Sequence, residues 1–353
     1  MTAPIDEILR HLTDLVAVET TNPPREIAGD GSLVQAVRNA LPGFDVDVRD
    51  LGDGSVIIEA KRGKAPVLFN VHLDTVPVAK GWSQDPFTLI VGNDRAVGLG
   101  ACDIKGAAAV LFALAAHTDH PMHLVLTTDE EAGQSTCIRE YVKSPAGVTQ
   151  AIIAEPTSVK AVLEHRGIFS ARMAFKGTSA HASVGAAKSA VHDAARWISA
   201  VIEHPLAAQN KLNVGRVEGG VKPNMIAAEA ELLFGFRAAP GEDYRDLLAT
   251  FDGATPVTGE RTIRFVGPAL PTDREGVAAA AQDRAAAWAD EVGLEKSAPV
   301  DFFTEAAFFA AAGVPAMVLG PGDIAQAHTA DEWVALADLA RAFDVYERIL
   351  RHG

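Results

Sequence analysis

The feature that most constrains this fold is a short apolar run ending in residues that can carry chemistry. The run Val67-Leu68-Phe69-Asn70-Val71 continues directly into His72-Leu73-Asp74. It predicts a strand buried on both faces, as in a parallel sheet, with a histidine and an aspartate at its carboxyl end. Residues two apart share one face of an extended chain, so one side chain could bind a metal ion while the other orients it. A His-x-Asp pair by itself is also typical of a hydrogen-bonded turn.

Three further apolar runs end in the same way. Residues 124–126 precede Glu130 and Glu131, residues 151–154 precede Glu155, and residues 316–319 precede a glycine-rich turn that leads to His328. Helical periodicity is found before, between and after these runs, over residues 5–16, 32–41, 105–116, 277–292, 305–312 and from about 331 onward. Residues 89–91 and 96–99 predict a short hairpin around Gly92-Asn93-Asp94. The alternation of strands and helices predicts an α/β fold with a mostly parallel sheet.

The order of elements changes between residues 164 and 268. The pattern there predicts strand, helix, strand, strand, helix and strand, at residues 169–175, 186–203, 211–217, 227–237, 243–251 and 262–266. This is the split βαβ order of a ferredoxin-like α+β unit. We therefore expect a catalytic domain of residues 1–163 and 269–353, interrupted by an inserted lid or dimerisation domain of residues 164–268.

Charge and cysteine content exclude several classes of protein. The net charge of −15 is spread along 353 residues, which argues against binding to nucleic acid or to anionic membranes. The first residues lack the cationic and apolar regions of a signal peptide, and no apolar run is long enough to span a bilayer. The two cysteines, Cys102 and Cys137, are too few for a disulfide framework. These features predict a cytoplasmic protein.

The carboxyl edge of the predicted sheet gathers chemically active residues, because the strands of a parallel sheet all end there. The expected set is His72, Asp74, Asp103, Glu130, Glu131, Glu155 and His328. So many carboxylates repel one another unless cations lie between them. Mixed histidine and carboxylate ligands suit Zn²⁺, with Co²⁺ or Mn²⁺ as alternatives, and a bridging carboxylate suits two ions about 3.5 to 4 Å apart.

Five motifs resemble, in order and spacing, those of the M20 metallopeptidase and deacylase family. They are His72-Leu-Asp74-Thr-Val-Pro, Gly100-Ala-Cys-Asp103-Ile-Lys-Gly106, Thr128-Asp-Glu130-Glu131, Ala154-Glu155-Pro156 and Ala327-His328-Thr-Ala-Asp-Glu332. The resemblance implies that His72, Asp103 and Glu155 bind one metal ion and that Asp103, Glu131 and His328 bind the other. It also implies that Asp74 orients His72 and that Glu130 is the general base.

The adjacent residues Glu130 and Glu131 have different roles in this interpretation. Consecutive residues of an extended segment point to opposite sides, so Glu131 can bind metal while Glu130 faces the substrate. A divalent cation lowers the pKa of water bound to it. Glu130 would then take a proton from this water and later give a proton to the leaving amine.

The inserted domain is expected to complete the substrate site. Its segment Gly177–Ala182 resembles the family's lid, whose histidine, here His181, reaches across a homodimer to stabilise the oxyanion. Asn224 and Arg237 resemble the family's polar and carboxylate-binding positions, and Arg237 suits a bidentate grip on a free α-carboxylate. Arg166 and, in the catalytic domain, Gly320 are also expected to border the substrate. His181 and Asn224 could instead be turn residues, and Arg237 a charge at a strand edge.

Within the family, the chain resembles the acetylornithine, acetylcitrulline and succinyl-diaminopimelate deacylases. The segment Gly98-Leu-Gly-Ala-Cys102 and the short chain resemble the acetylcitrulline branch. The expected reaction is therefore removal of the N-acetyl group from acetylcitrulline or acetylornithine, small amino acids of arginine biosynthesis. A succinyl-diaminopimelate desuccinylase, an M20 dipeptidase and a metal-free binding homologue remain as alternatives.

Three local patterns are given structural interpretations. His117, His120 and His123 surround Pro121, which predicts a solvated turn. Cys102 is expected to be a buried thiol. Asp301 and Glu305 are expected to cap the helix that follows them or to balance its dipole.

Overall fold

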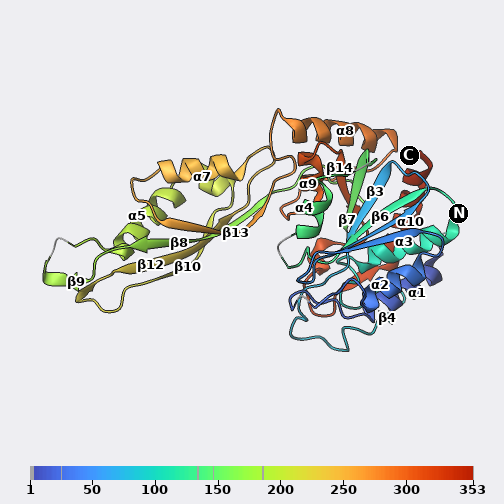
Figure 1. The fold of residues 1–353 in the computed structure, drawn as a ribbon, viewed down its shortest axis with the longest axis horizontal. Helices are drawn as coiled ribbons and strands as arrows, with labels where there is room; N and C mark the ends of the chain where they lie inside the picture. The colour runs from blue at the N-terminus through green and yellow to red at the C-terminus, as the bar shows by residue number, and fades with distance from the viewer. Residues whose placement is uncertain (1–3, 25, 133–134, 146, 185–186, 353) are drawn as a thin grey trace. The chain divides into compact units, whose positions relative to one another are not determined.

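The chain folds into two compact units (Figure 1). The computed structural model describes residues 4–24, 26–132, 135–145, 147–184 and 187–352. Unit 1 comprises Met1–Leu163, Ala280–Ala298 and Thr304–Gly353, and unit 2 comprises Glu164–Ala279 and Pro299–Phe303. No helix among the described residues is long and apolar enough to cross a membrane.

Unit 1 is built on a six-stranded sheet with the order β1-β2-β6-β3-β7-β14. The strands are β1 (Asp45–Asp50), β2 (Val56–Arg62), β3 (Val67–His72), β6 (Met122–Thr127), β7 (Gln150–Pro156) and β14 (Ala316–Gly320). The four strands from β6 to β14 run parallel, and β1 and β2 are antiparallel additions at one edge. Every residue of β3 and β6 is buried, as expected for central strands covered on both faces. The predicted α/β class is confirmed.

Helices pack around this sheet. They are α1 (Ile5–Val16), α2 (Ser32–Ala40), α3 (Lys105–His117), α4 (Thr136–Tyr141), α8 (Val277–Glu291), α9 (Ala306–Ala311) and α10 (Leu336–His352). Alanine-rich α3 is buried along nearly its whole length, because it packs between α1, α10 and β3. The Tyr346 ring of α10 packs edge-on against Phe69 at 5.1 Å, and its hydroxyl donates to the carbonyl of Leu319 at 2.7 Å. These contacts fix the strand that leads to His72.

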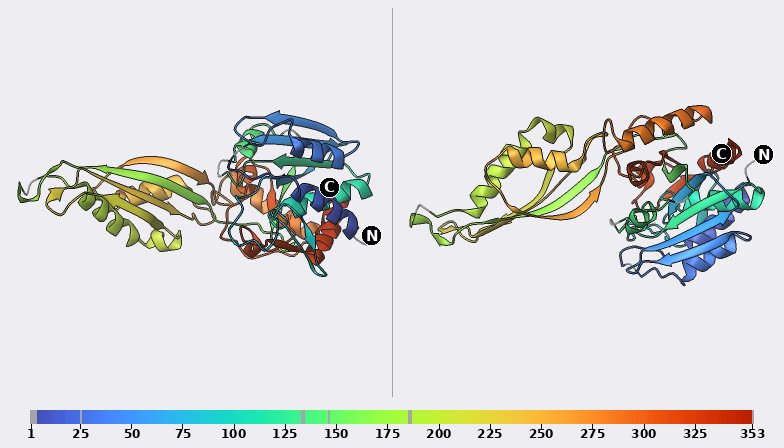
Figure 2. Two further views of the ribbon diagram at one scale, coloured as in Figure 1. Left: turned by 90° about the horizontal axis from the view of Figure 1, so that it is seen from below. Right: turned by 45° about the horizontal axis from the view of Figure 1, so that its top comes forward.

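Unit 2 is an antiparallel sheet with the order β10-β12-β8-β13. Its elements are β8 (Ile168–Lys176), β9 (Ala180–His181), η1 (Ala182–Val184), α5 (Ala190–Ile202), α6 (Pro205–Gln209), β10 (Asn213–Gly219), β11 (Met225–Ile226), β12 (Glu229–Phe236), α7 (Tyr244–Gly253) and β13 (Glu260–Gly267). Helices α5 and α7 cover one face (Figure 2). Alternate residues of β8 and β12 are buried, so the period-two pattern carries the core. The main elements follow the predicted split βαβ order.

The chain returns from unit 2 to unit 1 at a later residue than expected. The first crossing lies between Leu163 and Glu164, but unit 2 extends to Ala279 rather than to residue 268. Residues beyond 268 stay with unit 2 because Leu270 exchanges two backbone hydrogen bonds with His165, at 3.0 and 3.1 Å. The N–H of Val300 likewise donates to the carbonyl of Glu164 at 3.1 Å. The lid and dimerisation roles remain predictions.

Two local interpretations are wrong in part and one is confirmed. His123 is not in a solvated turn: it is buried in β6 and contacts Glu59 Oε1 at 2.8 Å, because cross-strand pairing overrides the sequence spacing. Glu305 precedes α9 without a side-chain capping bond, and Asp301 pairs instead with basic side chains of unit 2. Cys102 is a free, buried thiol, as expected.

The short hairpin predicted at residues 89–91 and 96–99 is confirmed, but a third strand that pairs with it was missed. The chain from Trp333 to Ala335 forms β15, which pairs with β5 (Arg95–Val97), and β5 pairs in turn with β4 (Ile90–Val91). The closing helix α10 therefore begins at Leu336, not directly after residue 331. A three-residue strand has too little sequence periodicity to be distinguished from the start of a helix.

Candidate metal centre

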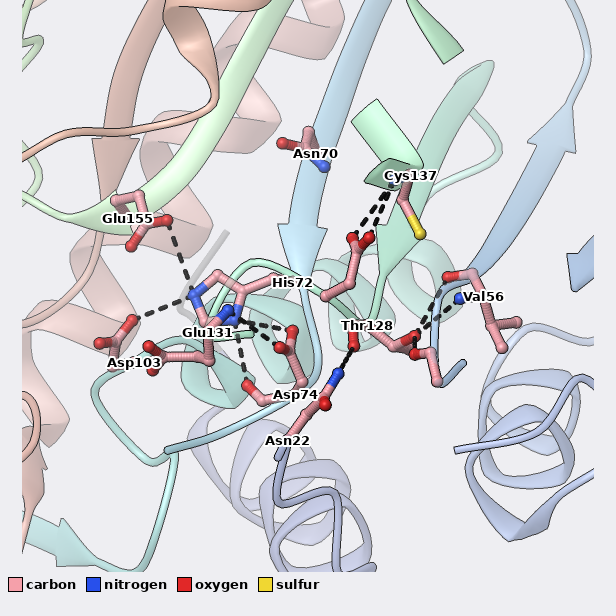
Figure 3. A network of polar contacts seen from close by, with 12 residues as sticks. Asn22, Val56, Asn70, His72, Asp74, Asp103, Thr128, Glu131, Cys137 and Glu155 are labelled. Atoms are coloured by element: carbon pink, nitrogen blue, oxygen red, sulfur yellow. Dashed lines mark hydrogen bonds and ion pairs between the residues drawn. The ribbon is translucent and has the colours of Figure 1, made fainter. Parts of the chain in front are cut away.

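The carboxyl ends of three parallel strands bring polar residues to one edge of unit 1 (Figure 3). His72 is the last residue of β3, Glu155 lies at the end of β7, and Glu131 follows β6. Asp103 comes from the loop between β5 and α3, and His328 follows the short helix η2 (Ile324–Gln326). The strand positions follow from the buried apolar runs, whereas the two loop residues are placed by tertiary contacts.

Two groups of potential ligands form at this edge, and they share one aspartate. His72, Asp103 and Glu155 make one group, and Asp103, Glu131 and His328 make the other, with ligand atoms in each group within 4.8 Å of one another. Asp103 turns its two oxygens to different imidazoles. Its Oδ1 lies 3.1 Å from His72 Nε2 and its Oδ2 lies 3.2 Å from His328 Nε2. This arrangement fits a carboxylate that bridges two cations.

The remaining contacts complete each group. His72 Nε2 lies 3.6 Å from Glu155 Oε1, and His328 Nε2 lies 2.9 Å from Glu131 Oε1. His328 has a φ of +61°, a left-handed conformation that non-glycine residues rarely adopt and that clusters at functional sites. The set of imidazole and carboxylate donors suits Zn²⁺, Co²⁺ or Mn²⁺.

The electrostatics of the centre call for positive charge. Hydrogen bonds to Asp103 and Glu131 raise the pKa of His328 to about 11. Burial disfavours the charged form of His72, but the nearby carboxylates outweigh it and raise its pKa well above the ordinary value. Burial raises the pKa of Glu155 to about 7. In the metal-free protein, protons on the two imidazoles therefore supply the charge that divalent cations would otherwise supply.

Asp74 organises the centre through both its backbone and its side chain. Its carbonyl accepts a hydrogen bond from His72 Nδ1 at 3.1 Å, while its carboxylate Oδ1 is farther from that nitrogen, at 3.6 Å. A carbonyl can only accept, so Nδ1 carries a proton and Nε2 faces Asp103 and Glu155. In the metal-free protein Nε2 is protonated as well, and loss of that proton makes its lone pair available to a metal ion. Oδ2 of Asp74 accepts the backbone N–H of Glu131 at 3.0 Å. Asp74 thus links ligands of both groups.

The segment that carries Glu130 is held by buried hydrogen bonds. Asn22 donates its side-chain amide to the carbonyl of Thr128 at 2.6 Å, and the Thr128 hydroxyl accepts the N–H of Val56 at 2.8 Å. Asp129 accepts the N–H of Cys137 at 3.1 Å. Glu130 itself is half-buried and belongs to neither ligand group. Among the described residues, its carboxylate therefore lies outside both sets of potential metal ligands.

His181 and Asn224 lie together in unit 2. The short strands β9 and β11 pair there, and the carbonyl of Asn224 accepts the N–H of Ala182 at 3.0 Å. Both side chains are exposed. The N–H of Ser183 donates to His181 Nδ1 at 3.2 Å, so a neutral imidazole carries its proton on Nε2.

The two arginines of unit 2 differ in how they are bound. Arg166 donates to Asp301 Oδ1 at 2.9 Å and to the backbone carbonyls of Gln209 and Arg237, so its guanidinium is already occupied. No residue in the described part of the chain accepts a hydrogen bond from the half-buried guanidinium of Arg237. Arg237 therefore fits an external anion better than Arg166 does.

Gly320 has a clear packing reason. A Cβ at this position would lie 2.1 Å from the carbonyl oxygen of Ala154, so β14 can approach β7 beside Glu155 only with glycine. Gly320 is buried in β14. Contact between Gly320 and a substrate remains a prediction.

Sequence reasoning missed two buried charged residues near the centre. Lys105 is fully buried and donates to the carbonyl of Val18 at 2.9 Å, and burial lowers its pKa to about 7. Glu332 is also buried, and its carboxylate meets the loop of Asp103. Both lie inside the five motifs, so the available signal was a charged residue next to a predicted ligand.

Comparison with known proteins shows what the chain resembles. The profile described as "Peptidase family M20/M25/M40" matches residues 68–352. N-acetyl-L-citrulline deacetylase of Xanthomonas campestris pv. campestris is 45% identical over 364 residues, which cover 99% of each chain. Acetylornithine deacetylase of Proteus mirabilis is 28% identical, covering 94% of this chain and 92% of the relative.

A solved structure agrees in fold. Aminopeptidase PepT from Bacillus cereus superposes with a TM-score of 0.74 at 20% identity, covering 99% of this chain and 98% of that chain. At this identity the likeness shows the shared fold. The sheets of unit 1 and unit 2 are both within the matched length.

Proposed function

Since this chain belongs to peptidase family M20/M25/M40, we propose that it is a two-metal deacetylase that removes the acetyl group from an N-acetyl amino acid, N-acetylcitrulline in particular. The observation that carries this proposal is the pair of ligand groups that share Asp103. The choice of substrate is supported by 45% identity, over essentially the whole chain, to a protein named N-acetyl-L-citrulline deacetylase. N-acetylornithine is the next candidate, because proteins named for that substrate match less closely.

We assign His72, Asp103 and Glu155 to one ion and Asp103, Glu131 and His328 to the other. Zn²⁺ is the proposed metal, and Co²⁺ and Mn²⁺ suit the same donors. When bound, such ions polarise a carbonyl and lower the pKa of water. The Nδ1–H bond of His72 to the Asp74 carbonyl keeps its Nε2 turned toward the first ion's position.

Glu130 is the proposed general base and acid. It adjoins the ligand Glu131 but stands outside both groups. Burial raises its pKa above the ordinary value, and the negative charges of Glu131 and Glu155 raise it further. A raised pKa makes the carboxylate a stronger base toward water, and a pKa nearer the working pH suits a group that acts as base in one step and as acid in the next.

We propose that unit 2 of one subunit supplies a hydrogen-bond donor, His181, to the active site of the other subunit in a homodimer. The N–H of Ser183 holds Nδ1 of His181 as an acceptor, which leaves Nε2–H as a donor for the oxyanion that forms when the amide is attacked. A homodimer is required for this role. Measurement of solution mass tests it, because a strictly monomeric active enzyme would contradict it.

Arg237 is the proposed partner of the substrate's free α-carboxylate, through two parallel N–H···O bonds. Arg166 is proposed to support this position, since it donates to the carbonyl of Arg237 at 3.2 Å. Asn224 is proposed to border the same substrate from the segment beside His181. The neutral ureide of citrulline and the cationic amine of ornithine differ at the distal end of the substrate.

A substrate panel with metal control tests the proposal. Purified protein is assayed with acetylcitrulline, acetylornithine, N-succinyl-diaminopimelate and a dipeptide, before chelation, after chelation and after return of Zn²⁺ or Co²⁺. We expect the highest kcat/KM with acetylcitrulline, loss of activity on chelation and recovery with metal. Preference for the succinylated diamine or the dipeptide, or activity that survives complete metal removal, would overturn it.

We also propose that the enzyme works in the cytoplasm. Both cysteines are free and buried, which agrees with a reducing compartment. Fractionation of producing cells, with activity in a compartment outside the cytoplasm as the contrary result, tests this location.

A further inference from the structure

Glu332 is a buried carboxylate that accepts hydrogen bonds from three backbone N–H groups of one loop. Its Oε2 accepts from Gly100 at 3.0 Å, and its Oε1 accepts from Cys102 at 2.8 Å and from Asp103 at 2.9 Å. Only 1% of the residue is exposed. Burial of an unsatisfied carboxylate is costly, so these three bonds are what make the position tenable.

The loop that receives these bonds has no regular structure of its own. Strand β5 ends at Val97 and α3 begins at Lys105. Between them, Gly100 has a φ of +77°, and a Cβ there would lie 2.8 Å from Cγ2 of Thr75. The N–H of Gly98 also donates to the backbone carbonyl of Glu332 at 3.0 Å. The loop conformation is therefore fixed largely by Glu332, from a position more than 200 residues away in sequence.

The same residue is part of the segment that delivers His328. Three residues separate His328 from Glu332, and β15 follows immediately and pairs with β5. Glu332 thus joins the segment of His328 to the loop of Asp103. His328 Nε2 and Asp103 Oδ2 lie 3.2 Å apart.

We propose that Glu332 is a positioning residue that holds Asp103 in the orientation in which its two oxygens face the two ligand groups. This inference rests on the proposed two-metal function. Because Oδ1 of Asp103 faces His72 and Oδ2 faces His328, a shift of its backbone moves both contacts together. The group with the exposed His328 has fewer buried partners than the group with His72, so its ion should be weakened first.

The test compares E332Q with a matched control in the same segment, D331N. Glutamine keeps the volume of Glu332, but its NH₂ group must face one of the three N–H donors. Asp331 accepts the N–H of Ser83 at 2.9 Å, and among the described residues its side chain makes no hydrogen bond or ion pair with the loop of Asp103. Both variants lose one negative charge.

We expect E332Q to bind its weaker ion about 10- to 100-fold less tightly and to lose a similar factor in kcat, while KM stays within about twofold. The visible spectrum of the Co²⁺-loaded variant should change, because the ligand geometry changes. D331N should match the wild type in ion affinity, spectrum and kcat. A purely structural role of Glu332 would lower only the amount of folded protein and would leave these values per folded molecule unchanged.

Wild-type ion affinity and an unchanged Co²⁺ spectrum in folded E332Q would overturn the proposal. If E332Q does not fold, E332D decides, since it keeps the charge with a shorter reach. Weakened binding of one ion by folded E332D supports the proposal, and unaltered binding overturns it. Ion affinity and spectrum need no substrate, so they decide the role of Glu332 even if the wild type fails to hydrolyse any acyl amino acid.

Discussion

Metal binding at this centre should release protons at a pH where an ordinary histidine has none left to give. We compare metal binding by metal-stripped protein at about pH 7 and at about pH 9. An imidazole binds a metal ion only in its neutral form, so the ion must displace any proton it carries. His328 holds that proton through contacts with Asp103 at 3.2 Å and Glu131 at 2.9 Å.

The size of the effect follows from the pKa of His328, which these carboxylates raise from 6.5 to about 11. Below that pKa, the apparent ion affinity rises about tenfold per pH unit for each proton displaced. Between pH 7 and pH 9 the increase is therefore about 100-fold, whereas an imidazole at the ordinary pKa would give less than about twofold.

The stability of the metal-free protein changes with pH in the opposite direction to its ion affinity. The imidazolium stabilises the metal-free fold fully below about pH 6.5, and this contribution is lost as pH rises through about 11. The metal-free protein should therefore become less stable over the range in which it binds metal more tightly.

Competition with a chromophoric chelator of known pH dependence measures the affinity at each pH. Calorimetry in buffers with different ionisation enthalpies counts the released protons independently. The variant H192A, which removes an exposed imidazole from α5, is the matched control and should leave the proton count unchanged. A flat affinity between pH 7 and pH 9, with no proton released, would refute the electrostatic reasoning.

Three further predictions concern individual side chains. Glu130→Gln should keep both ions and lower kcat by about 10²- to 10⁴-fold, whereas Glu131→Gln should lose one ion; equal metal loss in both variants, measured by elemental analysis, would contradict these roles. Gly106→Ala should lower the free energy of unfolding in urea by about 1 to 3 kcal/mol, because the new Cβ would lie 2.4 Å from a backbone oxygen. Gly253→Ala should change it by less than about 1 kcal/mol, because no atom lies within 4 Å of the new Cβ, and similar losses in both variants would count against the packing argument. Despite burial, hydrogen bonds from a histidine and a lysine lower the pKa of Glu59 to about 2. Its contribution to the free energy of unfolding is therefore full above about pH 4.5 and is lost as pH falls through about 2. Glu59→Gln should make the free energy of unfolding less dependent on pH in that window, and an unchanged pH dependence would be the contrary result.

The sequence by itself determined the main-domain sheet and the kinds of ligand. Apolar runs such as residues 67–71 specify buried strands, because burial acts on each residue and leaves its period in the chain. A parallel sheet then brings His72, Glu131 and Glu155 to one edge. The alternating pattern of unit 2 is local in the same way, and its main elements were predictable.

Tertiary structure alone decided how the residues between these strands are held. Asp103 is oriented by Glu332 across 229 positions, and His72 is oriented by the Asp74 carbonyl rather than mainly by its carboxylate. His123 found a cross-strand partner that its spacing did not suggest. Loops have no period to read, and their conformation comes from hydrogen bonds to distant backbone groups. Local sequence patterns therefore predict which residues are ligands, and long-range polar contacts determine the geometry of those ligands.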